Sequence, residues 1–380
     1  MEKLVLLPGP VMVHEDVLLR SAKQVMNHRS EEFEEVLREC LELSRYVFQT
    51  EGEVAIITGS GTAGMEAAVY SLVEPGEEVV AVVNGKFGER FADIAERRGA
   101  EVIRVEFEWG EAADPERVEE ALADSDAEVV TMVHCETSTT VLNPVEEVAR
   151  VCREYDVIFV VDAISSLGGA EFRMDDWGVD VCVTGSQKVL GCPPGLALVA
   201  VNDRALERME ERESGSYYLD LPKYLRFLKE DPMQTPYTPA VNEFYALLEA
   251  LRRLKKEGLE NRWERCRELQ RVVREGIRAL GLELFVEDDE IASPTVTGVV
   301  YPDGVDDREF RGLLRDKYDV VVAGGQDHLA GKIFRIGHMG EVRVRDMVTA
   351  VTCVGLAMRE LGVDVDVGAA AEAMADAIGG

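Results

Sequence analysis

Seven short runs rich in valine and isoleucine divide residues 52–201, and helix-like stretches separate them. Runs that are apolar on both faces need cover on both sides, so this alternation indicates strands buried between two layers of helices. The sequence therefore predicts an α/β fold built on a mainly parallel seven-stranded sheet. The predicted strands are residues 54–58, 78–83, 102–107, 129–134, 157–162, 179–184 and 196–201.

The pattern of the chain changes after residue 201. Residues 242–280 have the apolar spacing of two long helices that break near Gly258. The remainder mixes strand-like and helix-like stretches, which is typical of a smaller α+β domain. We predict three parts: a segment of residues 1–15, a large domain of residues 16–252 and a small C-terminal domain of residues 253–380.

The charge of the chain argues against one class of partner. With 73 acidic and 41 basic side chains, the formal net charge is −32. Most of such a surface would repel a phosphate backbone, so we expect no nucleic acid partner. The basic residues Arg252, Arg253, Lys255 and Lys256 are interpreted as a solvated helix face rather than a binding patch.

Cysteine usage and hydropathy indicate the compartment. The seven cysteines are scattered and never form a C-x-x-C pair, which is typical of reduced thiols. The amino-terminal stretch MEKLVLLPGP has too few apolar residues for a signal peptide. No apolar run approaches the ~20 residues that a membrane helix needs. We therefore expect a cytoplasmic protein without a membrane partner.

A glycine-rich turn follows the first predicted strand. In IITGSGTAGME (56–66), small residues would let backbone N–H groups approach an anion at the start of a helix. Gly59, Gly61 and Gly64 also satisfy G-x-G-x-x-G, the dinucleotide-binding pattern. That alternative requires an acidic residue at the end of the next strand, where this chain has Asn84. A tight turn without a ligand is the third interpretation.

Two charged residues follow later strands of the predicted sheet. Asp162 ends the run 157–162, and Lys188 lies just beyond the run 179–184. Taken alone, Asp162 could be a turn or cap residue and Lys188 a solvated side chain. Ligands of open α/β sheets bind at the carboxyl ends of strands, where both residues would lie. A lysine, a carboxylate and a phosphate-binding turn are together what pyridoxal phosphate requires of a protein.

Several segments resemble the class V aminotransferases of fold-type I, a family that depends on pyridoxal phosphate. The similarity is greatest to the alanine–glyoxylate and serine–pyruvate branch, including its archaeal broad-specificity members. It extends in the expected order from LLPGPVMV (6–13) to the final helices. The segments are GSGTAGMEAA (59–68), HCETSTTVLNP (134–144), VVDAISSLGG (160–169), SQKVLGCPPG (186–195) and FRIGHMG (334–340).

The resemblance implies two catalytic residues and two neighbours of the cofactor ring. Lys188 corresponds to the lysine that forms the Schiff base, and Asp162 to the partner of the pyridinium nitrogen. Phe87 takes the place of the aromatic residue that stacks on the ring, although an ordinary core aromatic is the alternative. Thr137 would bond near the ring hydroxyl or to Asp162, or else to its own backbone.

The resemblance also implies the residues around the cofactor phosphate. Gly61 and Thr62 would lie at the phosphate, and Gln187 beside the lysine would contact it. Thr238 corresponds to a phosphate ligand that the neighbouring subunit contributes, which implies a homodimer with shared active sites. Some relatives have a tyrosine where this chain has Thr235, so no role is assigned to Thr235.

Substrate contacts follow from the same family. Arg335 corresponds to the arginine that holds the substrate α-carboxylate, and its planar guanidinium suits a two-bond contact. The segment of residues 1–15, through Pro8 to Val11, would line the active-site entrance. No metal ligand set is predicted.

The implied activity is the transfer of an amino group from a small L-amino acid to a 2-oxo acid. Donors would be alanine, serine, aspartate or phosphoserine, and acceptors glyoxylate, pyruvate or 2-oxoglutarate. A cysteine desulfurase-like lyase is one alternative, but Gln187 stands where that family usually has a histidine. An NAD-dependent oxidoreductase is another, and it would leave Lys188 and Arg335 without a function.

Overall fold

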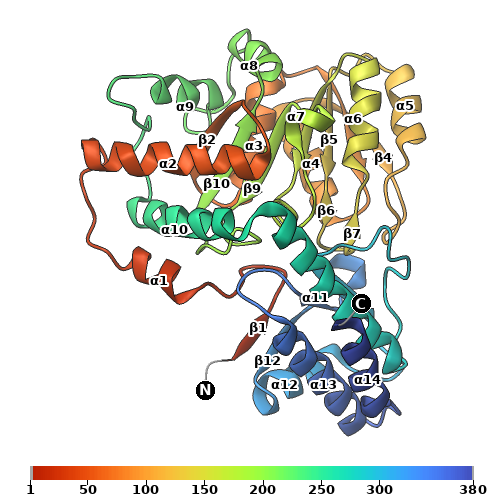
Figure 1. Cartoon of the computed structure of the whole chain (residues 1–380). Coiled ribbons are helices and arrows are strands. Elements are labelled where there is room, and N and C mark those ends of the chain that lie inside the picture. Colours follow the sequence, from red (N-terminus) through yellow and green to blue (C-terminus); the bar gives the residue numbers. More distant parts are fainter. Residues whose placement is uncertain (1–2, 379–380) are drawn as a thin grey trace.

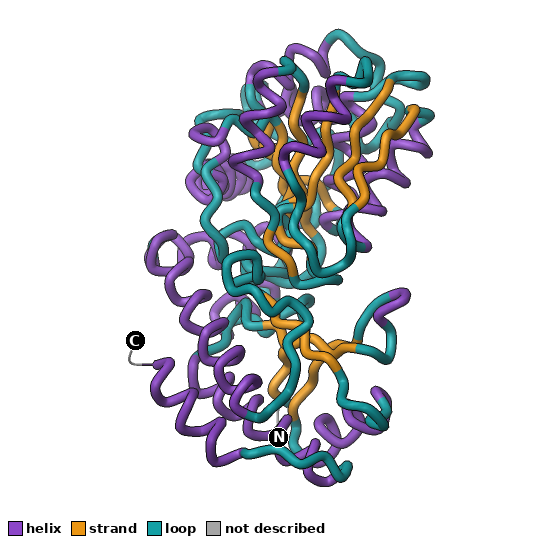
Figure 2. The backbone as a smooth tube through the Cα atoms, turned by 90° about the vertical axis from the view of Figure 1, so that its right-hand side faces the viewer, coloured by secondary structure: helices purple, strands orange, loops and turns teal. Residues whose placement is uncertain are grey.

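The computed structural model describes residues 3–378, which form two bodies, each with its own sheet (Figures 1 and 2). The larger sheet has seven strands in the order β2-β10-β9-β8-β5-β3-β4. Only β10 runs antiparallel to its neighbours, so the predicted mainly parallel sheet is confirmed. The strands are β2 (Glu53–Thr58), β3 (Glu78–Val83), β4 (Glu101–Glu106), β5 (Val129–Val133), β8 (Ile158–Asp162), β9 (Val181–Gly185) and β10 (Leu196–Val201).

Helices cover both faces of the large sheet, as Figure 2 shows. This cover explains why the central strands β5, β8, β9 and β10 are buried at every position. Because these strands are mainly apolar on both faces, both faces of the sheet must be covered. A layer of helices on each side provides that cover. The helices of this body are α1 (Glu15–Ser21), α2 (Glu31–Phe48), α3 (Gly61–Leu72), α4 (Lys86–Arg98), α5 (Pro115–Ala123), α6 (Val145–Glu154), α7 (Met174–Trp177), α8 (Asp203–Glu210), α9 (Leu221–Leu228) and α10 (Val241–Glu257).

The smaller body combines a four-stranded sheet with four helices and a short 3₁₀ turn. Its strand order is β1-β12-β13-β11, and β1 pairs in parallel with β12. The sequence analysis did not identify β1, because three residues are too few to show a period. The elements are β1 (Leu4–Leu6), α11 (Leu259–Ala279), β11 (Val296–Val300), α12 (Asp307–Lys317), β12 (Val320–Gly324), η1 (Asp327–Leu329), β13 (Ile333–Gly337), α13 (Val344–Glu360) and α14 (Val367–Ile378).

Helix α11 connects the two bodies. The predicted break near Gly258 is confirmed, since α10 ends at Glu257 and α11 begins at Leu259. Gly258 has a φ of 86°, a conformation that favours glycine. Trp263 packs in the core of the large body, whereas Leu269 packs in the core of the small one. The exact domain boundaries given above stay predictions.

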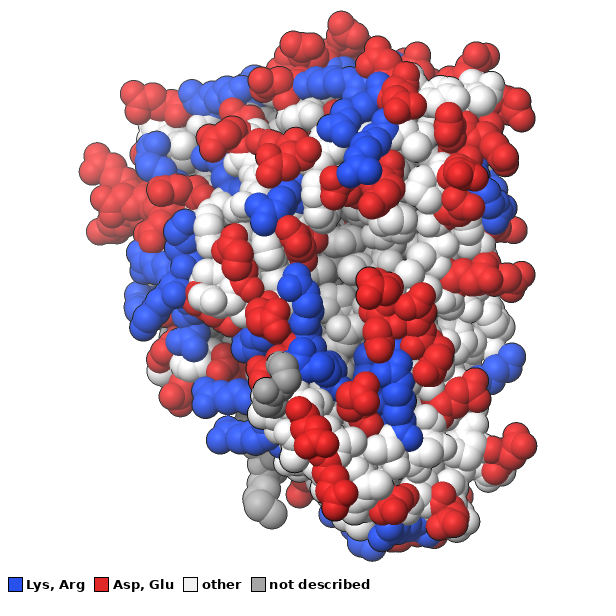
Figure 3. All heavy atoms as spheres, turned by 45° about the vertical axis from the view of Figure 1, so that its right-hand side comes forward, with Lys and Arg blue, Asp and Glu red and all other residues white. Residues whose placement is uncertain are grey.

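A two-stranded hairpin of β6 (Cys135–Glu136) and β7 (Val141–Leu142) follows the central strand β5. Acidic side chains spread over much of the face in Figure 3, with basic ones among them. Within residues 3–378, no helix is both long enough and apolar enough to cross a membrane. All seven cysteines lie in this part of the chain and are free thiols.

Candidate active site

One pocket collects most of the predicted site residues at the carboxyl edge of the large sheet. Seven of the nine line it, while Thr238 and Arg335 do not. This edge is where successive parallel strands deliver their following loops, so distant sequence segments meet there. The lining residues are Ser60, Gly61, Thr62, Phe87, Arg90, Cys135, Thr137, Asp162, Ile164, Ser165, Gln187 and Lys188.

Lys188 follows β9 and has its amine largely removed from water. Burial is the main cause that lowers its pKa to about 8, and the charges of Arg335 and Arg90 add to the effect, while Asp162 opposes it. Its Nζ donates a hydrogen bond to the Pro8 carbonyl. An amine with such a pKa is partly neutral near pH 7, and only the neutral form is a nucleophile.

The amino-terminal segment lies directly against this lysine. Gly9 has a φ of 112°, and a Cβ atom there would lie 2.8 Å from Lys188 Nζ. Glycine is therefore required both by the backbone conformation and by the close approach. This contact agrees with the expectation that Pro8 to Val11 line the entrance, which stays a prediction.

Asp162 is the last residue of β8 and is 2% exposed. Burial, reinforced by the nearby Glu136 charge, raises its pKa to about 7, although the Ile164 N–H and Lys188 act in the opposite direction. Its Oδ1 accepts that N–H at 2.7 Å, so the turn-residue interpretation is partly correct. Its Oδ2 has no hydrogen bond within residues 3–378, which leaves one carboxylate oxygen for a ligand.

The start of helix α3 forms the other end of the pocket. Ser60 is the N-cap residue and its side chain makes no capping bond, so the first N–H groups of the helix have no side-chain acceptor there. Gln187 Oε1 is buried without a hydrogen-bond partner in the described chain. Arg90 donates to Thr62 Oγ1 at 3.2 Å. N–H groups, an amide and a guanidinium together suit an anionic group.

Arg335 reaches this region from the small body. It lies in the middle of β13, is 5% exposed, and donates from Nη1 to the Thr137 carbonyl at 2.8 Å. Its Nε donates to the Gly324 carbonyl at 3.0 Å. Burial lowers its pKa to about 10, and Glu136 acts in the opposite direction. The two carbonyls engage Nε and Nη1, whereas Nη2 is free of partners in the described residues.

The surroundings of two predicted threonines can be described in the single chain. Thr137 Oγ1 donates to Ser165 Oγ at 2.6 Å and lies 3.4 Å from the Cys135 carbonyl, a contact that fits the alternative of a bond to the local backbone. Thr238 is exposed and does not line the pocket. An exposed position leaves Thr238 accessible to a second subunit. The roles of both threonines stay predictions.

Sequence reasoning missed two charged residues that organise the site. Glu136 is fully buried, and its Oε2 accepts the N–H groups of Phe87 at 2.9 Å and Gly88 at 3.0 Å. Arg90 lies one helical turn after Phe87 and stacks over its ring, 4.8 Å from the centroid. The spacing of three residues between Phe87 and Arg90 was the available signal, because such residues share a helix face.

Known proteins match the chain over almost its whole length. The sequence profile described as aminotransferase class-V matches residues 12–363. An uncharacterized aminotransferase of Methanocaldococcus jannaschii is 45% identical over 366 residues, which cover 96% of this chain and 94% of that protein. Alanine–glyoxylate aminotransferase of Callithrix jacchus is 36% identical, with 92% of this chain and 86% of that protein covered.

The fold of the chain also matches that of a solved structure over its whole length. Ureidoglycine–glyoxylate aminotransferase from Bacillus subtilis superposes with a TM-score of 0.95 at 33% identity, covering 100% of this chain and 99% of that one. The predicted fold-type I architecture is therefore confirmed, and neither the lyase nor the oxidoreductase alternative is favoured. Since the family profile and these relatives span nearly the entire sequence, the chain belongs to the class V aminotransferases.

Proposed function

We propose that this enzyme binds pyridoxal phosphate at the pocket of Lys188 and transfers an amino group from a small L-amino acid to a 2-oxo acid. Alanine, serine, aspartate and phosphoserine are the proposed donors, and glyoxylate, pyruvate and 2-oxoglutarate the acceptors. One observation carries the proposal: a lysine with a pKa of about 8 and a carboxylate with one unbonded oxygen line the same pocket. The relatives named as glyoxylate aminotransferases support this acceptor class.

The pocket fits such a cofactor at both of its ends. The side-chain Nε2 of Gln187 and the uncapped N–H groups of α3 provide donors for a phosphate. Phe87, which is half-buried against Arg90, provides an aromatic face for a ring. When bound, the cofactor supplies an electron sink for the carbon that loses its proton.

Three residues of this chain would then have separate roles in the reaction. Asp162 would hold a proton at the ring nitrogen, because its second oxygen has no partner in the described chain. Lys188 would bind the cofactor and then carry a proton between the substrate Cα and the cofactor C4′. Arg335 would hold the substrate carboxylate through Nη2, since the Gly324 and Thr137 carbonyls engage its Nε and Nη1 and fix the guanidinium.

The proposal includes a cytoplasmic homodimer with shared sites. Leu18 and Leu19 on α1 are 49% and 68% exposed, and Tyr217 is 81% exposed, which is unusual for large apolar side chains without a partner. Thr238 is exposed on the same body, where a second subunit could use it as a phosphate ligand. Seven free thiols fit a reducing compartment.

A donor screen on the purified enzyme tests the activity. Each amino acid is mixed with protein loaded with pyridoxal phosphate, and release of its 2-oxo acid is measured without an acceptor. We expect release with one or more small donors, and none from Lys188→Ala. Lys332→Ala, which removes an exposed lysine elsewhere in the small body, is the matched control. Equal release by Lys188→Ala would refute the proposed role of this lysine.

Subunit mixing tests the shared sites. Lys188→Ala and Thr238→Arg subunits are each expected to be inactive alone. After exchange in mild denaturant, mixed dimers would contain one site with neither substitution, so part of the activity should return. No recovery, with exchange verified by native mass spectrometry, would contradict sharing.

A further inference from the structure

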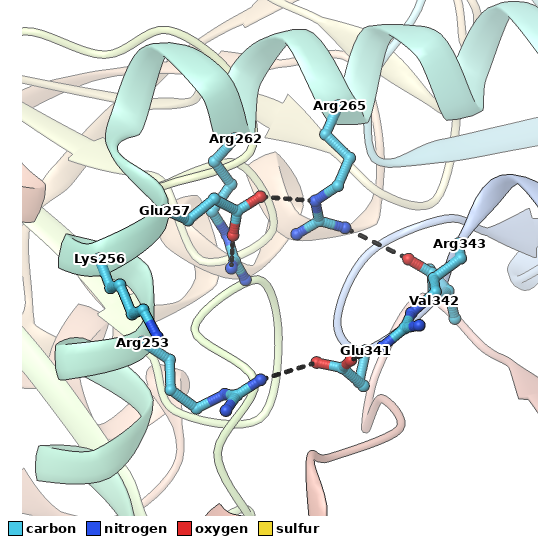
Figure 4. A pocket seen from close by; sticks show the side chains of 8 residues that line it. All are labelled: Arg253, Lys256, Glu257, Arg262, Arg265, Glu341, Val342 and Arg343. Carbon is cyan, nitrogen blue, oxygen red and sulfur yellow. Dashed lines mark hydrogen bonds and ion pairs between the residues drawn. The ribbon is translucent and has the colours of Figure 1, made fainter. Parts of the chain in front are cut away.

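A second pocket lies at the corner between α10 and α11, and it shares no lining residue with the pocket of Lys188. It has a volume of about 320 Å³ and is open to solvent on one side. Figure 4 shows that side chains from both helices point across it toward residues 341–343, the segment between β13 and α13. Pockets of this size accommodate small metabolites.

Cationic groups outnumber anionic ones in this corner pocket. The carboxylates of Glu257 and Glu341 face five cationic side chains, so the lining carries a formal charge of +3 in a chain of −32. Asp16, outside the lining, offsets one further charge by pairing with Arg253 at 3.2 Å. The cationic side chains are Arg253, Lys256, Arg262, Arg265 and Arg343.

The two carboxylates are shared and do not satisfy the cations. Glu257 accepts from Arg262 at 2.9 Å and from Arg265 at 2.6 Å. Its pKa lies below the usual value, because these two guanidiniums outweigh the opposing effect of burial. Lys256 has no ion pair or hydrogen bond within the described residues. Lys256 is exposed at the pocket and is therefore available to contact a further anion.

Arg262 provides an independent observation. It lines the pocket although it is only 8% exposed, and its Nε is buried without a hydrogen-bond partner in the described chain. Its Nη2 donates to the Val189 carbonyl at 2.6 Å. Burying a guanidinium is costly, and burial lowers the pKa of Arg262. The chain thus holds a fixed positive charge at the base of the pocket.

We propose that the corner pocket binds a small oxyanion with two or more negative charges, either a phosphate-bearing or a polycarboxylate metabolite. Guanidiniums bind both kinds of group through paired N–H bonds. Arg253 and Lys256, which the sequence analysis interpreted as parts of a solvated face, then belong to the site. The proposal goes beyond transamination and does not depend on it.

Such a ligand would join three segments of the chain. Arg265 already donates to the Val342 carbonyl at 3.3 Å, and Arg253 approaches Glu341 at 3.9 Å, so both helices contact the 341–343 segment (Figure 4). The Glu341 N–H donates to the Met12 carbonyl at 3.0 Å, which ties this segment to the amino-terminal residues near Lys188. Occupancy would therefore stabilise the contact between the two bodies.

Calorimetric titration of protein loaded with pyridoxal phosphate tests the proposal. Inorganic pyrophosphate and malonate are titrated separately at constant ionic strength set with sodium chloride, so that the two arms distinguish phosphate from carboxylate ligands. We expect saturable binding of at least one of them. The absence of saturable binding in both arms would overturn the proposal.

Matched variants assign the binding to the pocket. The double variant Lys256→Ala/Arg343→Ala should weaken binding at least about tenfold. The control Arg267→Ala/Arg345→Ala removes the same charge from α11 and α13 outside the pocket lining and should leave affinity within about twofold. Glu341→Gln removes a competing carboxylate and should tighten binding, a gain that misfolding cannot produce. Equal loss in both double variants, or no gain with Glu341→Gln, would refute the site.

Discussion

The large sheet buries one aspartate at the amino ends of its parallel strands and another at their carboxyl ends. The two aspartates differ in how many hydrogen bonds they accept. Asp180 directly precedes β9 at the amino edge, where it accepts from Phe159 N–H at 2.8 Å, from Asn202 at 2.9 Å and from Arg204 at 3.3 Å. Asp162 ends the neighbouring strand β8 at the carboxyl edge and accepts one N–H. Both are about equally buried, at 3% and 2% exposed.

The difference in hydrogen bonding distinguishes a structural aspartate, Asp180, from a functional one, Asp162. Burying a carboxylate is costly unless donors satisfy it. At Asp180 those donors come from the protein itself, which makes the residue a fixed part of the fold. At Asp162 one oxygen remains open toward a pocket that also holds Lys188. The incomplete hydrogen bonding, rather than the burial, identifies the functional residue.

The largest expected effect comes from the carboxyl edge. Asp162→Asn should lower kcat by about 10²–10⁴-fold, the usual range when a positioned proton-transfer group is lost. The variant should still fold, since the amide can accept from the Ile164 N–H as the carboxylate does. Steady-state kinetics together with calorimetry check this. If activity were lost only in proportion to the loss of folded protein, Asp162 would have a structural role like that of Asp180, which would contradict the comparison.

A residue from the small body extends the comparison. Arg335→Ala should reduce kcat/KM for the amino donor at least about 30-fold, the low end of about 2–5 kcal/mol for a truncated buried charge pair. Arg315→Ala removes an exposed arginine of the same body and should have no such effect. Unaltered kinetics in Arg335→Ala would mean that the substrate carboxylate is bound elsewhere.

A substitution at the amino edge of the sheet should instead lower the stability of the protein. Asp180→Ala leaves the Phe159 N–H and the Asn202 amide without their acceptor, so we expect a loss of about 1–3 kcal/mol in the free energy of unfolding. Activity of the folded fraction should stay within about threefold. Urea denaturation and active-site titration measure the two quantities. A catalytic defect without destabilisation would contradict the structural role of this aspartate.

The last expected effect is a pH dependence of stability. The pKa of Asp162 is raised to about 7 in the folded cofactor-free chain, from 3.8 in the unfolded one. The folded state then binds more protons between these values, so this group makes the protein less stable as pH rises from about 4 to 7. Asp162→Asn should therefore gain stability relative to the parent between pH 5 and 7.5. A constant difference over this range would show that the carboxylate titrates normally.

The sequence predicted the large sheet well because its central strands are mainly apolar on both faces, the pattern of strands covered by helices on both sides. It also placed Asp162 and Lys188 at one edge, since strand ends of a parallel sheet converge. Strand β1 was missed because its pairing with β12 joins residues more than 300 positions apart. Glu136 was missed because its four donors, including Ser138, come together only after β6 and α4 are folded.

The central claim is that the Lys188 amine reacts with the cofactor aldehyde. Protein loaded with pyridoxal phosphate, reduced with borohydride and digested with trypsin should yield one modified peptide, and fragmentation should place the added mass on Lys188. Modification of another lysine, such as the half-buried Lys86 or the exposed Lys332, with Lys188 unmodified would contradict the account.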